Sequence, residues 1–162
     1  MTARRAPEVT VRIERVLHAP PERVFQAFLD PELIRQWVAP DDLEVDRVEV
    51  DARVGGTIEV WHSKNGESTG KFEGRFVTID PPRELVYHWA FVGTAPEQGE
   101  YFDTLVTVRI LAAETGRSRI TVIHERLEAL RHGAPEIHVQ LVPGWNNCLA
   151  KLDRALGATP TA

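Results

Sequence analysis

Turn residues divide the middle of this chain into six short runs that have the length and composition of β-strands. Gly, Pro, Asn and Asp separate the runs, as is typical of connections between strands. Runs of about 6–10 residues with short connectors form hairpins rather than crossover units, so they predict an antiparallel sheet. The six runs are residues 43–50, 57–62, 71–79, 85–91, 105–111 and 120–127.

Further elements flank this predicted sheet. From Val9 onward apolar and polar residues alternate, which predicts a seventh strand. Pro21 and Asp30 each mark the start of a short helix. From about Pro135 to residue 156, apolar residues recur every three or four positions, which predicts one long amphipathic helix. Pro143 predicts a kink in that helix, or a restart with Pro143 in the first turn.

The order of elements predicts an α+β fold in which the sheet curves around the long C-terminal helix. About seven strands cannot bury both faces against so few helices, so the two short helices are expected to close one end. Curvature leaves a space that either side chains or a ligand fill. We expect residues 1–162 to form one domain, with flexible ends at 1–8 and 158–162.

Composition excludes several classes of function. Lys and Arg number 19 against 24 Asp and Glu, and the net charge of −5 disfavours binding to nucleic acid or an anionic membrane. A single cysteine, Cys148, excludes an internal disulfide. With no apolar run near about 18 residues and no signal-peptide pattern, we expect a cytoplasmic protein.

Several segments resemble one known superfamily, in the correct order along the chain. They are VRIERVLHAPPERVFQAF (11–28), DPELIRQW (30–37), Gly55-Gly56, GRFVTIDPPRELVYHW (74–89) and GWNNCLAKL (144–152). They are similar to the START-like, birch-pollen-allergen-like helix-grip superfamily (SRPBCC), and within it to homologues of the activator of the heat-shock-protein-90 ATPase. This resemblance implies a hydrophobic cavity between sheet and long helix, which members use for lipids, polyketides and other apolar molecules. A few members are enzymes, and the eponymous ones bind the chaperone and stimulate its ATPase.

Aromatic and histidine side chains are the candidates for the wall of such a cavity. By strand alternation Tyr87, Trp89 and Phe91 share one face, and we hypothesise that Trp89 faces Trp145 across the interior. The alternative is that these aromatics are ordinary core. The loop at 93–101 is of the kind that borders a functional opening. The candidate cavity residues are Trp37, His62, Phe76, Trp89, Phe91, His124 and Trp145.

His124 allows two interpretations, because alternation directs it inward among apolar residues. It is either a core histidine bonded to a neighbour, or a hydrogen-bond partner or titrating base for a ligand. No histidine pair has metal-ligand spacing, and Gly55-Gly56 precedes a strand rather than a helix, so we expect neither a metal nor a nucleotide cofactor. The sequence identifies no base that would activate Cys148 as a nucleophile, and no catalytic residue is identified.

Acidic residues cluster just before and within the first run of the sheet, among them Asp41, Asp42 and Glu44. They either protect a solvated edge strand or form a docking strip for a basic partner. We therefore favour binding of a small hydrophobic or aromatic ligand, with two alternatives. One is a co-chaperone that acts through the acidic strip, and the other is an enzyme that uses His124 or a carboxylate in the same cavity. A homodimer is left open.

Overall fold

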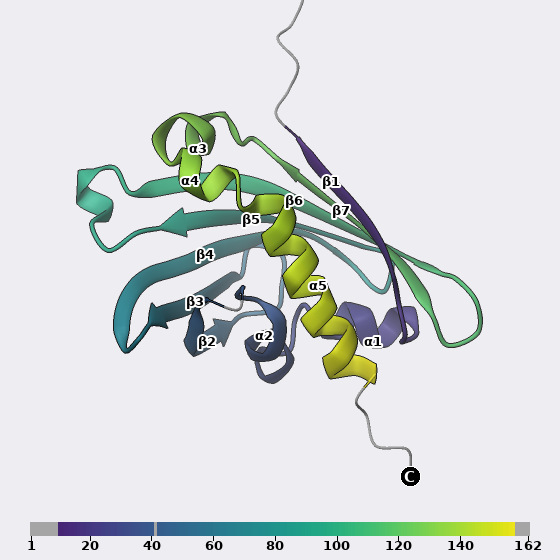
Figure 1. Cartoon of the computed structure of the whole chain (residues 1–162). Helices are drawn as coiled ribbons and strands as arrows, with labels where there is room; N and C mark the ends of the chain where they lie inside the picture. Colours follow the sequence, from purple (N-terminus) through teal and green to yellow (C-terminus); the bar gives the residue numbers. More distant parts are fainter. Residues whose placement is uncertain (1–9, 41, 158–162) are drawn as a thin grey trace, which may run out of the picture.

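The structure, a computed structural model, describes residues 10–40 and 42–157 (Figure 1). It is the α+β helix-grip fold that the sequence predicts, an open antiparallel sheet curved around a long C-terminal helix. The strands are β1 (Val11–Leu17), β2 (Glu44–Val50), β3 (Thr57–Lys64), β4 (Glu67–Asp80), β5 (Glu84–Val92), β6 (Tyr101–Ala112) and β7 (Ser118–Glu125). The ends that the sequence predicts to be flexible, residues 1–8 and 158–162, lie outside the described residues.

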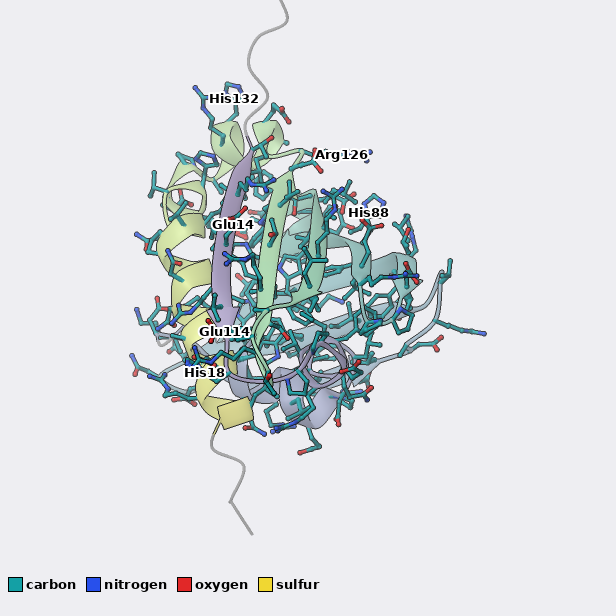
Figure 2. All side chains as sticks on the ribbon, turned by 90° about the vertical axis from the view of Figure 1, so that its right-hand side faces the viewer. Glu14, His18, His88, Glu114, Arg126 and His132 are labelled. Atoms are coloured by element: carbon teal, nitrogen blue, oxygen red, sulfur yellow. The ribbon has the colours of Figure 1, made fainter. Side chains whose placement is uncertain are left out.

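Strand order in the sheet is β1-β7-β6-β5-β4-β3-β2, so β1 and β2 are its edges. Within residues 10–40 and 42–157 the acidic strand β2 pairs on one side only, as the edge interpretation of its charges requires. Along each inner strand, residues that face α5 are buried and alternate with more exposed ones, for example Ile58, Val60 and His62 in β3. His88 lies on the outer face, where its Nδ1 is 3.1 Å from Asp103 Oδ2 (Figure 2).

Two short helices, α1 (Pro21–Gln26) and α2 (Pro31–Trp37), follow β1 as predicted. The Asp30 carboxylate accepts a hydrogen bond of 2.9 Å from the backbone N–H of Glu32 and so caps α2. Trp37 ends α2 and is buried, with its indole N–H donating to the carbonyl of Ala27. These helices close the lower end of the fold in Figure 1.

The C-terminal helical region differs from the single helix predicted from about Pro135. It consists of α3 (Glu128–Gly133), α4 (Pro135–His138) and α5 (Leu141–Gly157). Pro143 has no N–H to donate to the carbonyl of residue 139, so the helix cannot run continuously from α4 into α5. Instead α5 restarts at Leu141 with Pro143 in its first turn, which is the alternative that the sequence offered. No sequence signal predicted α3.

Helix α5 crosses the concave side of the sheet (Figure 1). Leu149, Leu152 and Leu156 on its inner side are fully or almost fully buried in the main hydrophobic core. This packing fixes the C-terminal half of α5 against the sheet and α2. The N-terminal half stands over the cavity described next. None of the helices within residues 10–40 and 42–157 is long and apolar enough to cross a membrane.

Candidate functional site

A cavity of about 880 Å³ lies between the inner face of the sheet and the N-terminal half of α5. Strands β3, β4 and β5 form its floor, α2 closes one side, and the loop that follows β5 reaches its rim. Gly93 and residues 98–100 of this loop line the cavity, as expected for a loop at an opening. Gly133, Ala134, Glu136 and Ile137, from the end of α3 into α4, also line the cavity.

All the candidate cavity residues named from the sequence lie in this wall. Their positions follow from strand alternation and from helical spacing, which direct them toward the space between α5 and the sheet. The residues are Trp37, His62, Phe76, Trp89, Phe91, His124 and Trp145.

Aromatic rings cover much of the floor. Phe72 stacks on Trp89 with ring centroids 5.1 Å apart and meets Phe91 edge-on at 5.7 Å. Tyr87 packs edge-on against Trp89 at 5.7 Å. Gly74 lies opposite Trp89 in the register, and a Cβ there would stand only 3.3 Å from the Trp89 ring. The absence of a side chain at Gly74 therefore gives the Trp89 ring its room.

A chain of hydrogen bonds runs from α5 across β7 and β6 to β5. The indole Nε1–H of Trp145 donates to Nδ1 of His124 over 3.1 Å. Because Nδ1 is an acceptor, the proton of the neutral ring is on Nε2, which lies 2.7 Å from Thr104 Oγ1 and donates to it. The Thr104 hydroxyl in turn donates to the backbone carbonyl of Trp89. Each of the three donors in this series of hydrogen bonds has an acceptor.

His124 is therefore a core histidine that is bonded on both sides. Burial, together with the nearby His138, lowers the pKa of His124 to about 3. The ring is neutral near pH 7, and neither nitrogen is open to a ligand. The expectation that His124 could bond a ligand or act as a titrating base finds no support in this geometry. Trp89 and Trp145 both line the cavity, joined through His124 and Thr104 rather than by direct ring contact.

Two buried polar groups of the wall are open to the cavity. Burial, and then the nearby Cys148, raise the pKa of Tyr87 well above its usual range, so its hydroxyl stays protonated. Among the described residues this hydroxyl has no hydrogen-bond partner. His62 bonds Thr69 Oγ1 through Nδ1 at 2.5 Å, and within the same part of the chain its Nε2 has no partner. Burial lowers the pKa of His62, so this ring also favours the neutral form.

Tyr87 was not among the cavity residues predicted from the sequence, although strand alternation placed it on the same face as Trp89. The sequence signal that could have found it is a hydroxyl group on a ring that is expected to be buried.

The structure places the three acidic residues of the predicted docking strip in different surroundings. Asp41 lies outside the described residues, Asp42 lines the cavity, and Glu44 is exposed on the edge strand β2. Asp42 therefore belongs to the rim, where Glu100 and Glu136 also lie.

Side chains with metal-ligating groups do not gather here. Among residues 10–40 and 42–157, no group of three or more His, Cys, Asp or Glu could hold a metal ion. Cys148 lies in the cavity wall as a buried thiol. The wall of the site is mainly apolar, with a few neutral polar groups inside and carboxylates at the rim.

Comparison with known proteins assigns the chain to a family. A family model described as activator of Hsp90 ATPase homolog 1-like protein matches residues 18–157. A crystal structure from Chromobacterium violaceum is 27% identical with a TM-score of 0.72, covering 91% of this chain and 96% of that one. One from Rhodobacter sphaeroides is 19% identical with a TM-score of 0.77, covering 96% and 99%. One from Silicibacter pomeroyi, described as an AHSA1 protein, is 20% identical with a TM-score of 0.74, covering 94% and 100%. No curated protein matches the chain.

Proposed function

This chain belongs to the family of activator of Hsp90 ATPase homolog 1-like proteins, and we propose that it binds a small, largely apolar molecule in the cavity beneath α5. The cavity itself is the observation that carries this proposal. Protein interiors are close-packed and hold few voids larger than a water molecule. A space of about 880 Å³ is within the range of pockets that hold small molecules, about 300–1,000 Å³.

The composition of the wall supports an apolar, flat ligand. Phe72, Trp89 and Phe91 present ring faces and edges that a planar molecule can stack on. Removal of apolar surface from water contributes about 25 cal/mol per Å² and would supply most of the affinity. The Tyr87 hydroxyl and the open nitrogen of His62 would then orient the ligand.

Gly144 offers a way to test this proposal without disturbing the core. It lines the cavity from α5, and the nearest atom to a Cβ built there is Pro40 Cγ at 3.9 Å. Gly144→Phe therefore adds a ring at the cavity without a backbone clash. Asn146→Phe is the matched control, because Asn146 is exposed on the same helix and does not line the cavity.

The ligand for the test is N-phenyl-1-naphthylamine, an uncharged aromatic amine whose fluorescence rises in apolar surroundings. We expect saturable binding with one site per chain to the wild type and to Asn146→Phe, and at least about tenfold weaker binding to Gly144→Phe. Folding is checked by circular dichroism in each case. A folded wild-type chain that does not bind, or equal binding to Gly144→Phe, would contradict the proposal.

A co-chaperone role is the second candidate, and exposed charge on β2 favours it. Glu44 and Glu49 stand on the free edge of the sheet, and the matching family is described by activation of the Hsp90 ATPase. Charge reversal at Glu44 and Glu49 should then abolish stimulation of a chaperone's ATPase while sparing N-phenyl-1-naphthylamine binding. Asp42 is unsuitable for this variant because it lines the cavity.

A further inference from the structure

We propose that the cavity selects uncharged ligands and excludes carboxylates, sulfonates and other anions. This inference rests on the proposed function, because it concerns the ligand of the same cavity. An anion that leaves water for an apolar site needs a cation or several hydrogen-bond donors to replace its hydration. The charges around the cavity decide whether such partners exist.

Lys71 is the one Lys or Arg among the described cavity-lining residues, and its ammonium is already engaged elsewhere. Its Nζ lies 2.8 Å from Glu59 Oε2 and 3.0 Å from Glu73 Oε2. Glu59 and Glu73 alternate with inward-facing Val60 and Phe72, so this group lies on the outer face of the sheet. The two carboxylates raise the pKa of Lys71 and neutralise its charge there.

The two buried histidines and the buried tyrosine of the wall are neutral near pH 7. Burial lowers the pKa of both His62 and His124, so neither ring supplies a positive charge near pH 7. Burial raises the pKa of Tyr87, so its hydroxyl stays protonated and uncharged. A ligand therefore meets single neutral donors or acceptors, which suit a hydroxyl, a carbonyl or an amine N–H and do not compensate a buried anion.

Carboxylates at the rim of the cavity also disfavour the binding of an anion. Asp42, Glu100 and Glu136 line the cavity, and Asp42 and Glu136 are exposed. Glu100 Oε2 accepts a hydrogen bond of 3.1 Å from the backbone N–H of Ala95, which holds its carboxylate at the loop. An approaching anion is repelled by these groups, although salt screens the exposed ones.

A matched pair of fluorescent ligands tests the inference. N-phenyl-1-naphthylamine and 1-anilinonaphthalene-8-sulfonate share the same ring system and differ by one sulfonate. We expect the chain of 162 residues to bind the sulfonate at least about tenfold more weakly than N-phenyl-1-naphthylamine, a difference of about 1.4 kcal/mol. The triple variant Asp42→Asn, Glu100→Gln and Glu136→Gln should recover about threefold or more of that loss. The control double variant Glu44→Gln and Glu49→Gln removes charge from the edge strand and should leave the ratio unchanged.

Each outcome separates the two proposals. Equal affinity for both ligands overturns the charge selection and leaves the proposed function standing. Binding of neither ligand overturns both. An equal recovery in the control double variant shows that net charge, and not the rim, sets the ratio, and so overturns the role of the rim carboxylates.

Discussion

The indole nitrogen of Trp145 lies 3.1 Å from Nδ1 of His124, and this hydrogen bond ties the N-terminal half of α5 to the inner face of the sheet. The C-terminal half of α5 is held by buried leucines, whereas the N-terminal half spans the cavity. A hydrogen bond therefore holds the N-terminal half of α5 to the sheet, whereas close packing holds its C-terminal half. It also fixes the tautomer of His124.

Trp145→Phe should destabilise the chain because it leaves Nδ1 of His124 without its donor. Loss of one partner of a buried hydrogen bond costs about 1–3 kcal/mol. Urea unfolding followed by circular dichroism measures the change. Trp61→Phe is the control. Trp61 packs under Arg47, whose Cζ is 4.7 Å from the ring centroid. Weakening this cation–π contact costs at most about 0.5–1 kcal/mol. Equal losses in the two variants would contradict the role of the Trp145 bond.

The stability of the chain should fall in acid through His124. The unfolded chain takes up a proton on this ring below about pH 6.5. The folded chain does not do so until about pH 3. The contribution of His124 to the free energy of unfolding is therefore complete above about pH 6.5. Between about pH 6.5 and pH 3 this contribution falls by up to about 1.4 kcal/mol for each unit that the pH is lowered.

Urea unfolding at several pH values between about 7 and 4 measures this slope. His124→Gln should flatten it. Since burial also lowers the pKa of His62, part of the slope remains in the His124 variant. A His124→Gln variant with the full wild-type slope would argue against a neutral, buried His124.

Gly74→Ala should lower the melting temperature. Its Cβ would lie 2.6 Å from the backbone oxygen of His88 and 2.7 Å from Ile58 Cγ2, and the backbone cannot move aside cheaply. Overpacking of this kind costs about 1–3 kcal/mol. Gly144→Ala is the matched control, with room for the methyl group and a better helix former within α5. Differential scanning calorimetry that shows no loss in Gly74→Ala would be inconsistent with the close approach of β4 and β5.

Tyr87→Phe should weaken binding of hydroxylated ligands selectively. The hydroxyl is open to the cavity, and one hydrogen bond there contributes about 0.5–1.5 kcal/mol. We expect a loss of up to about tenfold in affinity for 2-naphthol and no loss for naphthalene, measured by calorimetry. Equal losses for the two ligands would mean that Tyr87 acts only through packing.

Local patterns in the sequence were sufficient for the strands and for the direction of their side chains. Alternation placed Trp89 and Phe91 on the inner face, and helical spacing placed Trp145 on the inner side of α5. Pro143 predicted an interruption of the C-terminal helix, as a kink or as a restart. These features depend on neighbours a few positions away, where propensity and periodicity act.

Features that depend on distant residues were beyond such patterns. His124 and Thr104 are 20 positions apart, and their bond follows from the register of β6 and β7. Only that pairing separates the two interpretations of His124. The rim likewise gathers Asp42, Glu100 and Glu136 from three separate segments. The cavity volume depends on how far α5 stands from the sheet, which tertiary packing sets.

The four tryptophans offer the most direct test of ligand binding beneath α5. Trp37, Trp89 and Trp145 line the cavity, whereas Trp61 packs under Arg47 and Lys71 and does not line it. The measurement is a titration of the ¹⁵N-labelled chain with N-phenyl-1-naphthylamine, followed through the four indole N–H signals, each assigned by a Trp→Phe variant. The account predicts that the signals of the cavity tryptophans shift while that of Trp61 stays in place. Unchanged cavity signals at saturating ligand, or a shift of Trp61 alone, would contradict it.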